Sequence, residues 1–451
     1  MPTDAGRPPA VAVAGVGAVS AAGLGADRLW SAVTGGRVLT GPVTRFDVSG
    51  YPTRRAGEVP AAALAALAGP VPAHESLVGP VPGLESLAGP VPGPESLAGR
   101  YLAAAVLEAL AHAGLAADYR REVLGLYVGT VMGTRPLLDR GIEPGRLRVS
   151  GSGWARADGL LDPVRAVVRG IGPAVLVGPG CSSGNAAIAA GFRAVRAGEV
   201  DVAVCAGVDE LSLEVFAMFT SLRALAPDVV RPFDADRRGT MPAEGAGVLV
   251  LERADRLATR GGPVRARLLA CASAADAYHP TQPHPDGAAL VATMQAALAR
   301  AGRQPDDVDW VCAHGTGTPA NDGVEARATA KVLAGRDRPV VSSVKGQLGH
   351  AVGAAAALEA VLVVRALAED FVPGNVTLHR PDPECDGIDL VPPEGRRTRL
   401  DLVASPAFGF GGAVTTLLFG KGDGLPVGRG DGLSVGRGDG LSVGKGDGDV
   451  G

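Results

Sequence analysis

The chain has 451 residues, enough for two or three core-sized units or for one large duplicated domain. Its formal net charge of −4 gives no electrostatic case for binding nucleic acid or an anionic membrane surface. No uninterrupted apolar run reaches the roughly 18 residues of a membrane span. The first residues lack the charged and apolar regions of a signal peptide, so we expect a cytoplasmic protein without a membrane segment.

The first apolar stretch, residues 11–19, predicts a strand that ends in a glycine turn. Gly15 and Gly17 match the start of a dinucleotide-binding fingerprint, but Ser20 stands where its third glycine would be. This departure argues against nucleotide binding.

Two repeats interrupt the chain. Residues 69–98 hold three copies of a ten-residue unit, Gly-Pro-Val-Pro-x-x-Glu-Ser-Leu-x. Two prolines in each copy exclude a regular helix or a central strand, so we expect a surface insertion, with a docking segment for a partner as the alternative. After residue 421 the chain repeats Gly-Asp-Gly-Leu-x-Val-Gly-Arg/Lys, which predicts a disordered tail.

Elsewhere, short apolar runs alternate with amphipathic segments, and the pattern occurs twice. The predicted strands are residues 124–130, 174–177, 202–207, 247–251, 264–273, 308–314, 340–344 and 413–419. The predicted helices are residues 26–35, 101–113, 162–169, 287–301, 322–333 and 353–367. Strands that alternate with helices in two similar halves predict α/β layers around buried sheets.

The stretch around Cys181 has the strongest chemical character. Residues 174–177 read as a buried strand, residues 178–180 break it, and small residues at helical spacing follow as far as Gly198. Cys181 would then lie at a helix N-terminus, where the helix dipole and free N–H groups lower a thiol pKa. The alternative is that Cys181 is a small buried structural residue, as most free cysteines are.

The other four cysteines show neither disulfide nor metal-ligand spacing with Cys181 or with each other, which fits a reducing cytosol. They are Cys205, Cys271, Cys312 and Cys385.

Two histidine motifs follow predicted strands. His314 stands in Ala-His-Gly-Thr-Gly-Thr-Pro and His350 ends Ser-Val-Lys-Gly-Gln-Leu-Gly-His, while residues 408–412, Phe-Gly-Phe-Gly-Gly, form a turn with available N–H groups. Histidines at strand ends can project into a cleft and hold a developing oxyanion. Each histidine alone could be structural, and Phe408 and Phe410 could be core residues. A cysteine and two histidines at strand ends of one architecture favour a shared site.

Together these motifs resemble the β-ketoacyl-[acyl carrier protein] synthases (ketosynthases) of the thiolase superfamily, from about residue 11 to residue 419. The resemblance also rests on further motifs in the family's order, which are residues 44–47, 180–184, 231–237, 244–247 and 276–279. It implies a thiolase fold, with two similar α/β halves in a layered αβαβα core. Residues 1–254 would form the first half, residues 255–420 the second, and residues 421–451 a tail.

The resemblance implies a decarboxylative Claisen condensation in fatty-acid or polyketide biosynthesis. Cys181 would take an acyl chain as a thioester from an acyl carrier protein. His314 and His350 would bind the thioester carbonyl of a malonyl-type extender and promote its decarboxylation. Backbone N–H groups of Cys181 and Phe410 would hold the oxyanion, and Phe410 would also gate the acyl pocket.

The remaining implied roles are supporting ones. Lys345 would pair with Glu359 to order the site, while Thr316 and Thr318, with Thr281, would hydrogen-bond the phosphopantetheine arm. No metal or bound organic cofactor is implied. The implied partners are an acyl carrier protein and a second subunit, in a homodimer or in a heterodimer with a related ketosynthase subunit.

Departures from the family pattern bear on chain-length preference. Residues 178–180 replace the usual Thr-Ala type of pair before the cysteine, and Ala413 and Val414 replace the usual Thr-Asn. One alternative is a non-condensing partner subunit like a chain-length factor, but such subunits generally lack the cysteine. Another is a thiolase acting on CoA esters, which uses Cys/His/Cys, whereas the third position here is His350.

Overall fold

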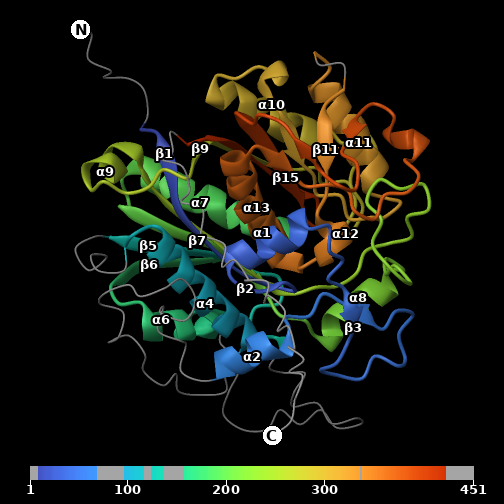
Figure 1. Ribbon diagram of the computed structural model, residues 1–451, viewed down its shortest axis with the longest axis horizontal. Helices are drawn as coiled ribbons and strands as arrows, with labels where there is room; N and C mark the ends of the chain where they lie inside the picture. Colours follow the sequence, from blue (N-terminus) through green and yellow to red (C-terminus); the bar gives the residue numbers. More distant parts are fainter. Residues whose placement is uncertain (1–8, 69–95, 116–122, 137–156, 336–337, 423–451) are drawn as a thin grey trace, which may run out of the picture.

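The computed structural model describes residues 9–68, 96–115, 123–136, 157–335 and 338–422 (Figure 1). Within these ranges, backbone hydrogen bonds join twelve strands into one mixed sheet, in the order β13-β11-β10-β15-β16-β9-β1-β8-β7-β5-β6, with β2 beside β1. The sheet consists of two sets of strands that repeat one pairing pattern.

The first set begins with two antiparallel pairings and ends with two parallel ones. Strand β1 pairs antiparallel with β8, β8 antiparallel with β7, β7 parallel with β5, and β5 parallel with β6. The bounds are β1 Val11–Ser20, β8 Gly245–Arg253, β7 Val202–Asp209, β5 Leu124–Gly129 and β6 Ile171–Val177.

The second set repeats this pattern: β9 with β16 and β16 with β15 are antiparallel, and β15 with β10 and β10 with β11 are parallel. The bounds are β9 Ala266–Ala275, β16 Ala413–Lys421, β15 Leu402–Phe408, β10 Trp310–Cys312, β11 Val340–Ser342 and β13 Asp389–Leu390. Strands β1 and β9 pair at one end and join the two sets. The repetition agrees with two similar halves, while the boundary at residue 254 stays a prediction.

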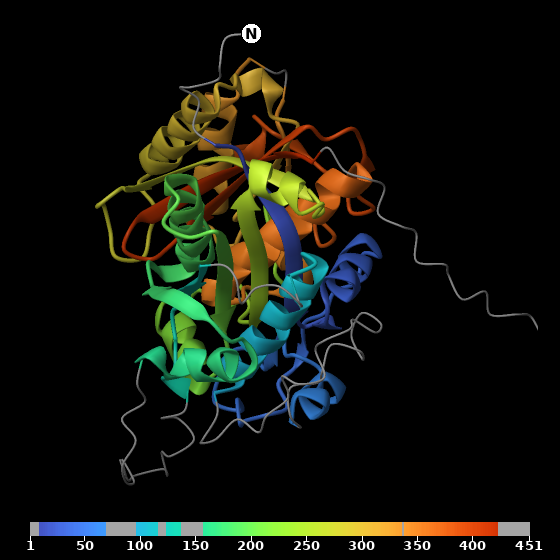
Figure 2. The same cartoon turned by 90° about the vertical axis from the view of Figure 1, so that its left-hand side faces the viewer.

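Helices cover both sets and separate them. Two central helices, α7 (Ser183–Ala197) and α13 (Ala355–Glu369), pack on each other and contact strands of both sets. Outside them, α4 (Leu97–His112) covers β1 and β8, and α10 (Ala288–Ala301) covers β9 and β16. In both cartoon views α4 and α10 lie on opposite sides of the molecule (Figures 1 and 2). The result is the expected αβαβα layering.

The other elements connect these layers at the periphery or beside the site. The helices are α1 Ala26–Thr34, α2 Ala61–Ala68, α6 Asp162–Val167, α8 Leu213–Ser221, α9 Ala254–Thr259, α11 Asp322–Val332 and α12 Lys345–Leu348. The short strands are β2 Gly23–Leu24, β3 Gly41–Pro42, β4 Arg55–Ala56, β12 Phe371–Val372 and β14 Arg396–Arg397.

Helices and strands of this fold approach each other so closely that several contact positions require glycine. A Cβ at Gly129 would overlap the carbonyl oxygen of Ser183 in α7, and one at Gly247 would overlap the backbone of Ala357 in α13. Gly15 and Gly17 likewise allow α4 to lie directly on β1. The glycines of the apparent nucleotide fingerprint therefore serve helix packing.

Two local expectations are wrong. Strand β6 lies at the end of the sheet, where no further strand among the described residues pairs with its outer edge, and its residues 172–175 are exposed rather than buried. Ser96 and Ala98, which close the third repeat copy, are buried and begin α4, because the Ser96 hydroxyl accepts a hydrogen bond from Gly99 N–H as the helix N-cap. The rest of that repeat, and residues 423–451 of the tail, lie outside the described residues.

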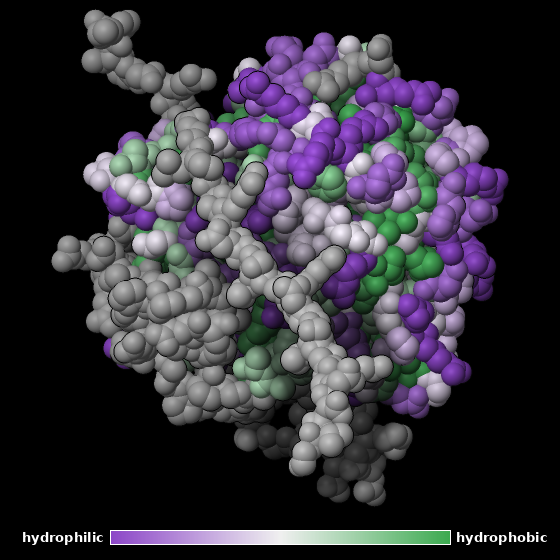
Figure 3. Space-filling model, viewed as in Figure 1, coloured by the Kyte–Doolittle hydropathy of each residue, from purple (hydrophilic) through white to green (hydrophobic). Residues whose placement is uncertain are grey.

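The surface is mainly polar on the face that Figure 3 shows. Hydrophilic side chains cover much of its upper part, over the second half of the chain, with hydrophobic residues between them. In the part of the chain that the structure describes, the helices are too short or too polar for a membrane span.

The glycine packing is testable at Gly17. Its added Cβ would overlap the carbonyl oxygen of Ala105 in α4, so Gly17→Ala should lower the free energy of unfolding by about 1–3 kcal/mol. Gly50→Ala is the control, because a Cβ there meets nothing within 4 Å. Thermal unfolding at matched protein concentration measures both variants. Equal midpoints for the two would contradict the packing argument.

Candidate active site

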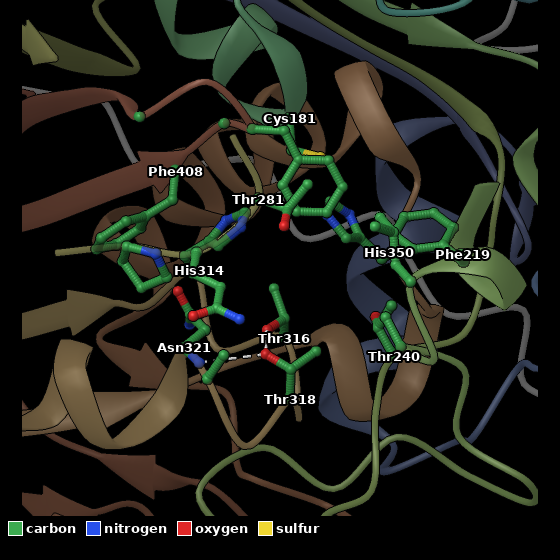
Figure 4. Close-up of a pocket in the computed structure, with 18 of the residues that line it drawn as sticks. Cys181, Phe219, Thr240, Thr281, His314, Thr316, Thr318, Asn321, His350 and Phe408 are labelled. Atoms are coloured by element: carbon green, nitrogen blue, oxygen red, sulfur yellow. Dashed lines mark hydrogen bonds between the residues drawn. The ribbon is translucent and has the colours of Figure 1, made fainter. Parts of the chain in front are cut away.

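One cavity, of about 240 Å³, collects most of the residues predicted to carry chemistry. Figure 4 shows the Cys181, His314 and His350 side chains around its inner end, with Thr316 and Thr318 across from them. The predicted residues that line it are Cys181, Thr281, His314, Thr316, Thr318, His350 and Phe410. The two other predicted residues, Lys345 and Glu359, lie behind the histidines and do not line it.

Cys181 is placed by a turn that only glycine permits. It lies in a 3₁₀ turn, Gly180–Ser182, between β6 and α7, and Gly180 has a φ of +64°. A Cβ on Gly180 would lie 2.8 Å from the backbone nitrogen of Phe410. Two constraints, a left-handed backbone and this close approach, therefore bring the cysteine turn against the 408–412 turn.

The expected low thiol pKa is wrong. Burial raises the pKa of Cys181 to about 12, although the charge of Lys345 and the cysteine's own N–H act in the opposite direction. The position of Cys181 near a helix N-terminus was predicted correctly. However, its side chain is only 5 % exposed, and the hydration that the thiolate loses on burial outweighs the stabilisation from Lys345 and the N–H group. The resting residue is a thiol.

His314 is fixed by a buried carboxylate that the sequence reasoning missed. Glu325, in α11, accepts hydrogen bonds from the N–H groups of His314 and Gly315 at 2.7 and 2.8 Å, and from Asn321 Nδ2 at 3.1 Å. Burial raises the pKa of Glu325 to about 7. Three donors on one carboxylate hold the histidine loop against α11.

Asp322, a second buried carboxylate, holds the part of that loop that carries Thr316 and Thr318. It accepts hydrogen bonds from the N–H groups of Gly317 and Phe233, at 3.0 and 2.8 Å. With Asp322 in place, the hydroxyls of Thr316 and Thr318 lie 2.9 Å apart at the cavity. Thr281 lines the cavity from a different loop, where its hydroxyl lies 3.4 Å from His279 Nδ1.

His350 is held through its backbone. Its N–H donates to the carbonyl of Met241 at 2.7 Å, and its carbonyl accepts from Ala243 N–H at 2.9 Å. The His350 and His314 rings meet edge to face, with centroids 5.4 Å apart. Among the described residues, Nδ1 of His350 has no hydrogen-bond partner.

Lys345 lies behind the two histidines and links His314 to Glu359. Its Nζ donates hydrogen bonds to Glu359 and, at 2.6 Å, to the carbonyl oxygen of His314. The same atom lies 3.5 Å from His314 Nδ1. The predicted Lys345–Glu359 pair is therefore present in the structure. Burial, with the nearby charge of Lys345, holds the pKa of both His314 and His350 well below its usual range. Both imidazoles are neutral.

A third missed carboxylate lies at the end of β7. Asp209 accepts hydrogen bonds from Thr130 Oγ1 at 2.7 Å, Met132 N–H at 2.8 Å and Gly353 N–H at 2.7 Å. Burial raises its pKa to about 6. An acidic residue at the end of a buried strand was the available signal. In the described ranges, no cluster of three or more His, Cys, Asp or Glu side chains has the geometry to hold a metal ion.

Comparison with known proteins gives the same assignment in both halves. Residues 95–256 match the model of the β-ketoacyl synthase N-terminal domain, and residues 265–379 match that of the C-terminal domain. The 3-oxoacyl-[acyl-carrier-protein] synthase 2 of Synechocystis is 31% identical, over 91% of this chain and 98% of its own length. The chain belongs to the β-ketoacyl synthase family.

Two further similarities extend this result. The tetracenomycin polyketide synthase ketoacyl synthase alpha subunit of Streptomyces glaucescens is 31% identical, over 89% of this chain and 95% of its own length. The solved structure of the ishigamide ketosynthase/chain length factor superimposes with a TM-score of 0.76 at 30% identity, over 92% of this chain and all of that one. The β-ketoacyl synthase assignment and the thiolase-like fold are confirmed, and the protein is an acyltransferase of the condensing type.

The high thiol pKa makes a direct prediction. Because burial raises the pKa of Cys181 to about 12, its thiolate fraction and hence its alkylation rate should rise about tenfold per pH unit between about pH 7 and about pH 10. Iodoacetamide labelling followed by peptide mass mapping measures Cys181 alone. Cys205, buried and also raised in pKa, is the internal control and should stay unlabelled. A rate that levels off near neutral pH would contradict the stated effect of burial.

Proposed function

We propose that this β-ketoacyl synthase joins an acyl chain carried on Cys181 to a malonyl-type extender by decarboxylative Claisen condensation. The observation that carries the proposal is the meeting of Cys181, His314 and His350 on one cavity, with Lys345 behind them. Cys181 can hold the acyl chain, and the neutral imidazoles of His314 and His350 can donate hydrogen bonds to an enolate. The reaction needs both of these functions.

The first step is acyl transfer from the carrier to Cys181. Because the thiol is neutral, its proton must leave as sulfur attacks, and a neutral imidazole in the same cavity can accept it. The tetrahedral oxyanion lies toward the N–H groups of Cys181 and Phe410. Among the described residues, the Phe410 N–H meets no other acceptor. The carrier thiol leaves with the proton.

The second step generates the carbon nucleophile. The extender carbonyl accepts hydrogen bonds from His314 and His350, the bond from C2 to the carboxylate breaks, and CO₂ leaves. The electron pair moves into the enolate, whose oxygen the two imidazoles hold. C2 then attacks the acyl carbonyl on Cys181, the bond from that carbonyl to sulfur breaks, and the released thiolate takes a proton from water. Every other role falls to a side chain or N–H of this chain, so the scheme needs no metal or organic cofactor.

The partners follow from the same scheme. The name of the Synechocystis relative places its substrate on an acyl carrier protein, and we assign the same donor here. Its phosphopantetheine arm would run past Thr316, Thr318 and Thr281 toward the histidines. A second subunit, identical or related, would pair along the exposed end strand β6. The five unbridged cysteines support a cytoplasmic location.

A non-condensing partner subunit is the second candidate. The name of the ishigamide neighbour includes a ketosynthase together with a chain length factor. Cys181, with a complete pair of histidines facing the same cavity, favours the condensing role.

Acylation of Cys181 is the test. Intact-protein mass spectrometry, after incubation with acyl carrier proteins that carry different acyl chains, should show a gain of one acyl group in the wild type. Cys181→Ala should show none, because it lacks the nucleophile. A folded wild-type protein that gains no acyl group from any donor would rule out the condensing enzyme in favour of the partner subunit.

A further inference from the structure

Thr240 is a cavity residue to which the scheme above gives no role. Thr240 lines the cavity, its side chain is 1 % exposed, and its hydroxyl has no hydrogen-bond partner among the described residues. In Figure 4 it lies below His350 and Phe219, with its oxygen on the cavity side. A buried hydroxyl without a partner destabilises the folded protein, so this group is suited to a partner that arrives with the substrate.

The backbone fixes this hydroxyl in place. Thr240 N–H donates to the carbonyl of Ala224, and its own carbonyl accepts from Ala226, both at 2.7 Å. The next residue, Met241, accepts the hydrogen bond from His350 N–H. Thr240 is therefore held at a fixed position next to the segment that binds His350, and both its N–H and its carbonyl already have hydrogen-bond partners. Only the side-chain hydroxyl is left to bind a ligand.

The cavity lining near Thr240 combines apolar side chains with one cation. Phe219, Leu222, Arg223 and Ala224 line the cavity, and Ala224 is hydrogen-bonded to Thr240 through the backbone. The threonines across the cavity differ, because Thr316 and Thr318 already hydrogen-bond each other. Thr240 thus offers the cavity an unpartnered hydroxyl, and Arg223 is a cation in the same lining.

The extender offers one polar group that the scheme leaves without a contact. His314 and His350 take its carbonyl oxygen, and Thr316, Thr318 and Thr281 take the arm. The carboxylate remains, attached one carbon from the carbonyl and therefore close to His350. We propose that the Thr240 hydroxyl donates a hydrogen bond to the extender carboxylate and so selects and orients it, an inference that rests on the proposed function.

The contact suits the step that follows. When the bond from C2 to the carboxylate breaks, the electron pair passes to the enolate held by the histidines, and the carboxylate leaves as CO₂. Thr240 keeps its proton throughout. One hydrogen bond from Thr240 orients the carboxylate for the loss of CO₂.

The experiment compares two ligands that differ only in the carboxylate. The probes are the malonyl and acetyl amides of pantetheine, whose amide bond does not acylate Cys181, titrated calorimetrically against the full chain. Thr240→Val keeps the side-chain shape and should raise the Kd of the malonyl amide about tenfold, the usual effect of losing a hydrogen bond to a charged group. The Kd of the acetyl amide should not change.

Thr240→Ser is the matched control, because it keeps the hydroxyl and should bind the malonyl amide as the wild type does. Thr240→Val should also melt no lower than the wild type, since it removes an unpartnered buried hydroxyl. An equal loss for both amides would assign Thr240 to cavity shape, and an unchanged malonyl Kd would exclude the contact. Either result overturns the inference. Binding is read without turnover, so failure of the condensation reaction itself would be seen separately.

Discussion

A buried lysine determines how this site works. The Lys345 side chain is 1 % exposed, and a buried cation is tolerated only with charged and polar partners around it. Its partners are Glu359 in the central helix α13 and the carbonyl of His314 after β10. The lysine therefore connects the core between the two strand sets to the loop that carries His314. Burial, with the nearby charge of Lys345, keeps both imidazoles neutral.

The same burial acts on the cysteine in the opposite sense. It raises the thiol pKa and lowers the imidazole pKa values, so all three groups are neutral at rest. In the proposed scheme, negative charge develops during the reaction on the acyl oxyanion and on the enolate. The 408–412 turn is proposed to hold the oxyanion, and the histidine loop, which Glu325 and Asp322 fix in place, is proposed to hold the enolate.

Sequence patterns predicted most of the strands and helices and many of the cavity residues, but not the central strand β15 or the helix α8. Strand-end cysteine and histidine motifs brought Cys181, His314 and His350 to one place, because the strands of both sets end near the central helices. The thiol pKa was mispredicted because the burial of Cys181 depends on residues distant in the sequence, such as Phe216 and Val352, which the local stretch does not reveal. Exposure of β6 depends likewise on its place at the end of the sheet. The sequence did not point to Glu325 or Asp209, because their hydrogen bonds join residues 10 to 144 positions apart in the chain. It did not point to Thr240, because the relevant feature is a buried hydroxyl without a hydrogen-bond partner among the described residues.

The central claim is that the two histidines, and not the thiol, release CO₂ from the extender. Its most direct test is CO₂ release from a malonyl-loaded acyl carrier protein by Cys181→Ala and by His350→Ala, each shown to be folded by circular dichroism. The account predicts that Cys181→Ala still releases CO₂ and that His350→Ala does not. Loss of CO₂ release in Cys181→Ala, or its survival in His350→Ala, would contradict the account.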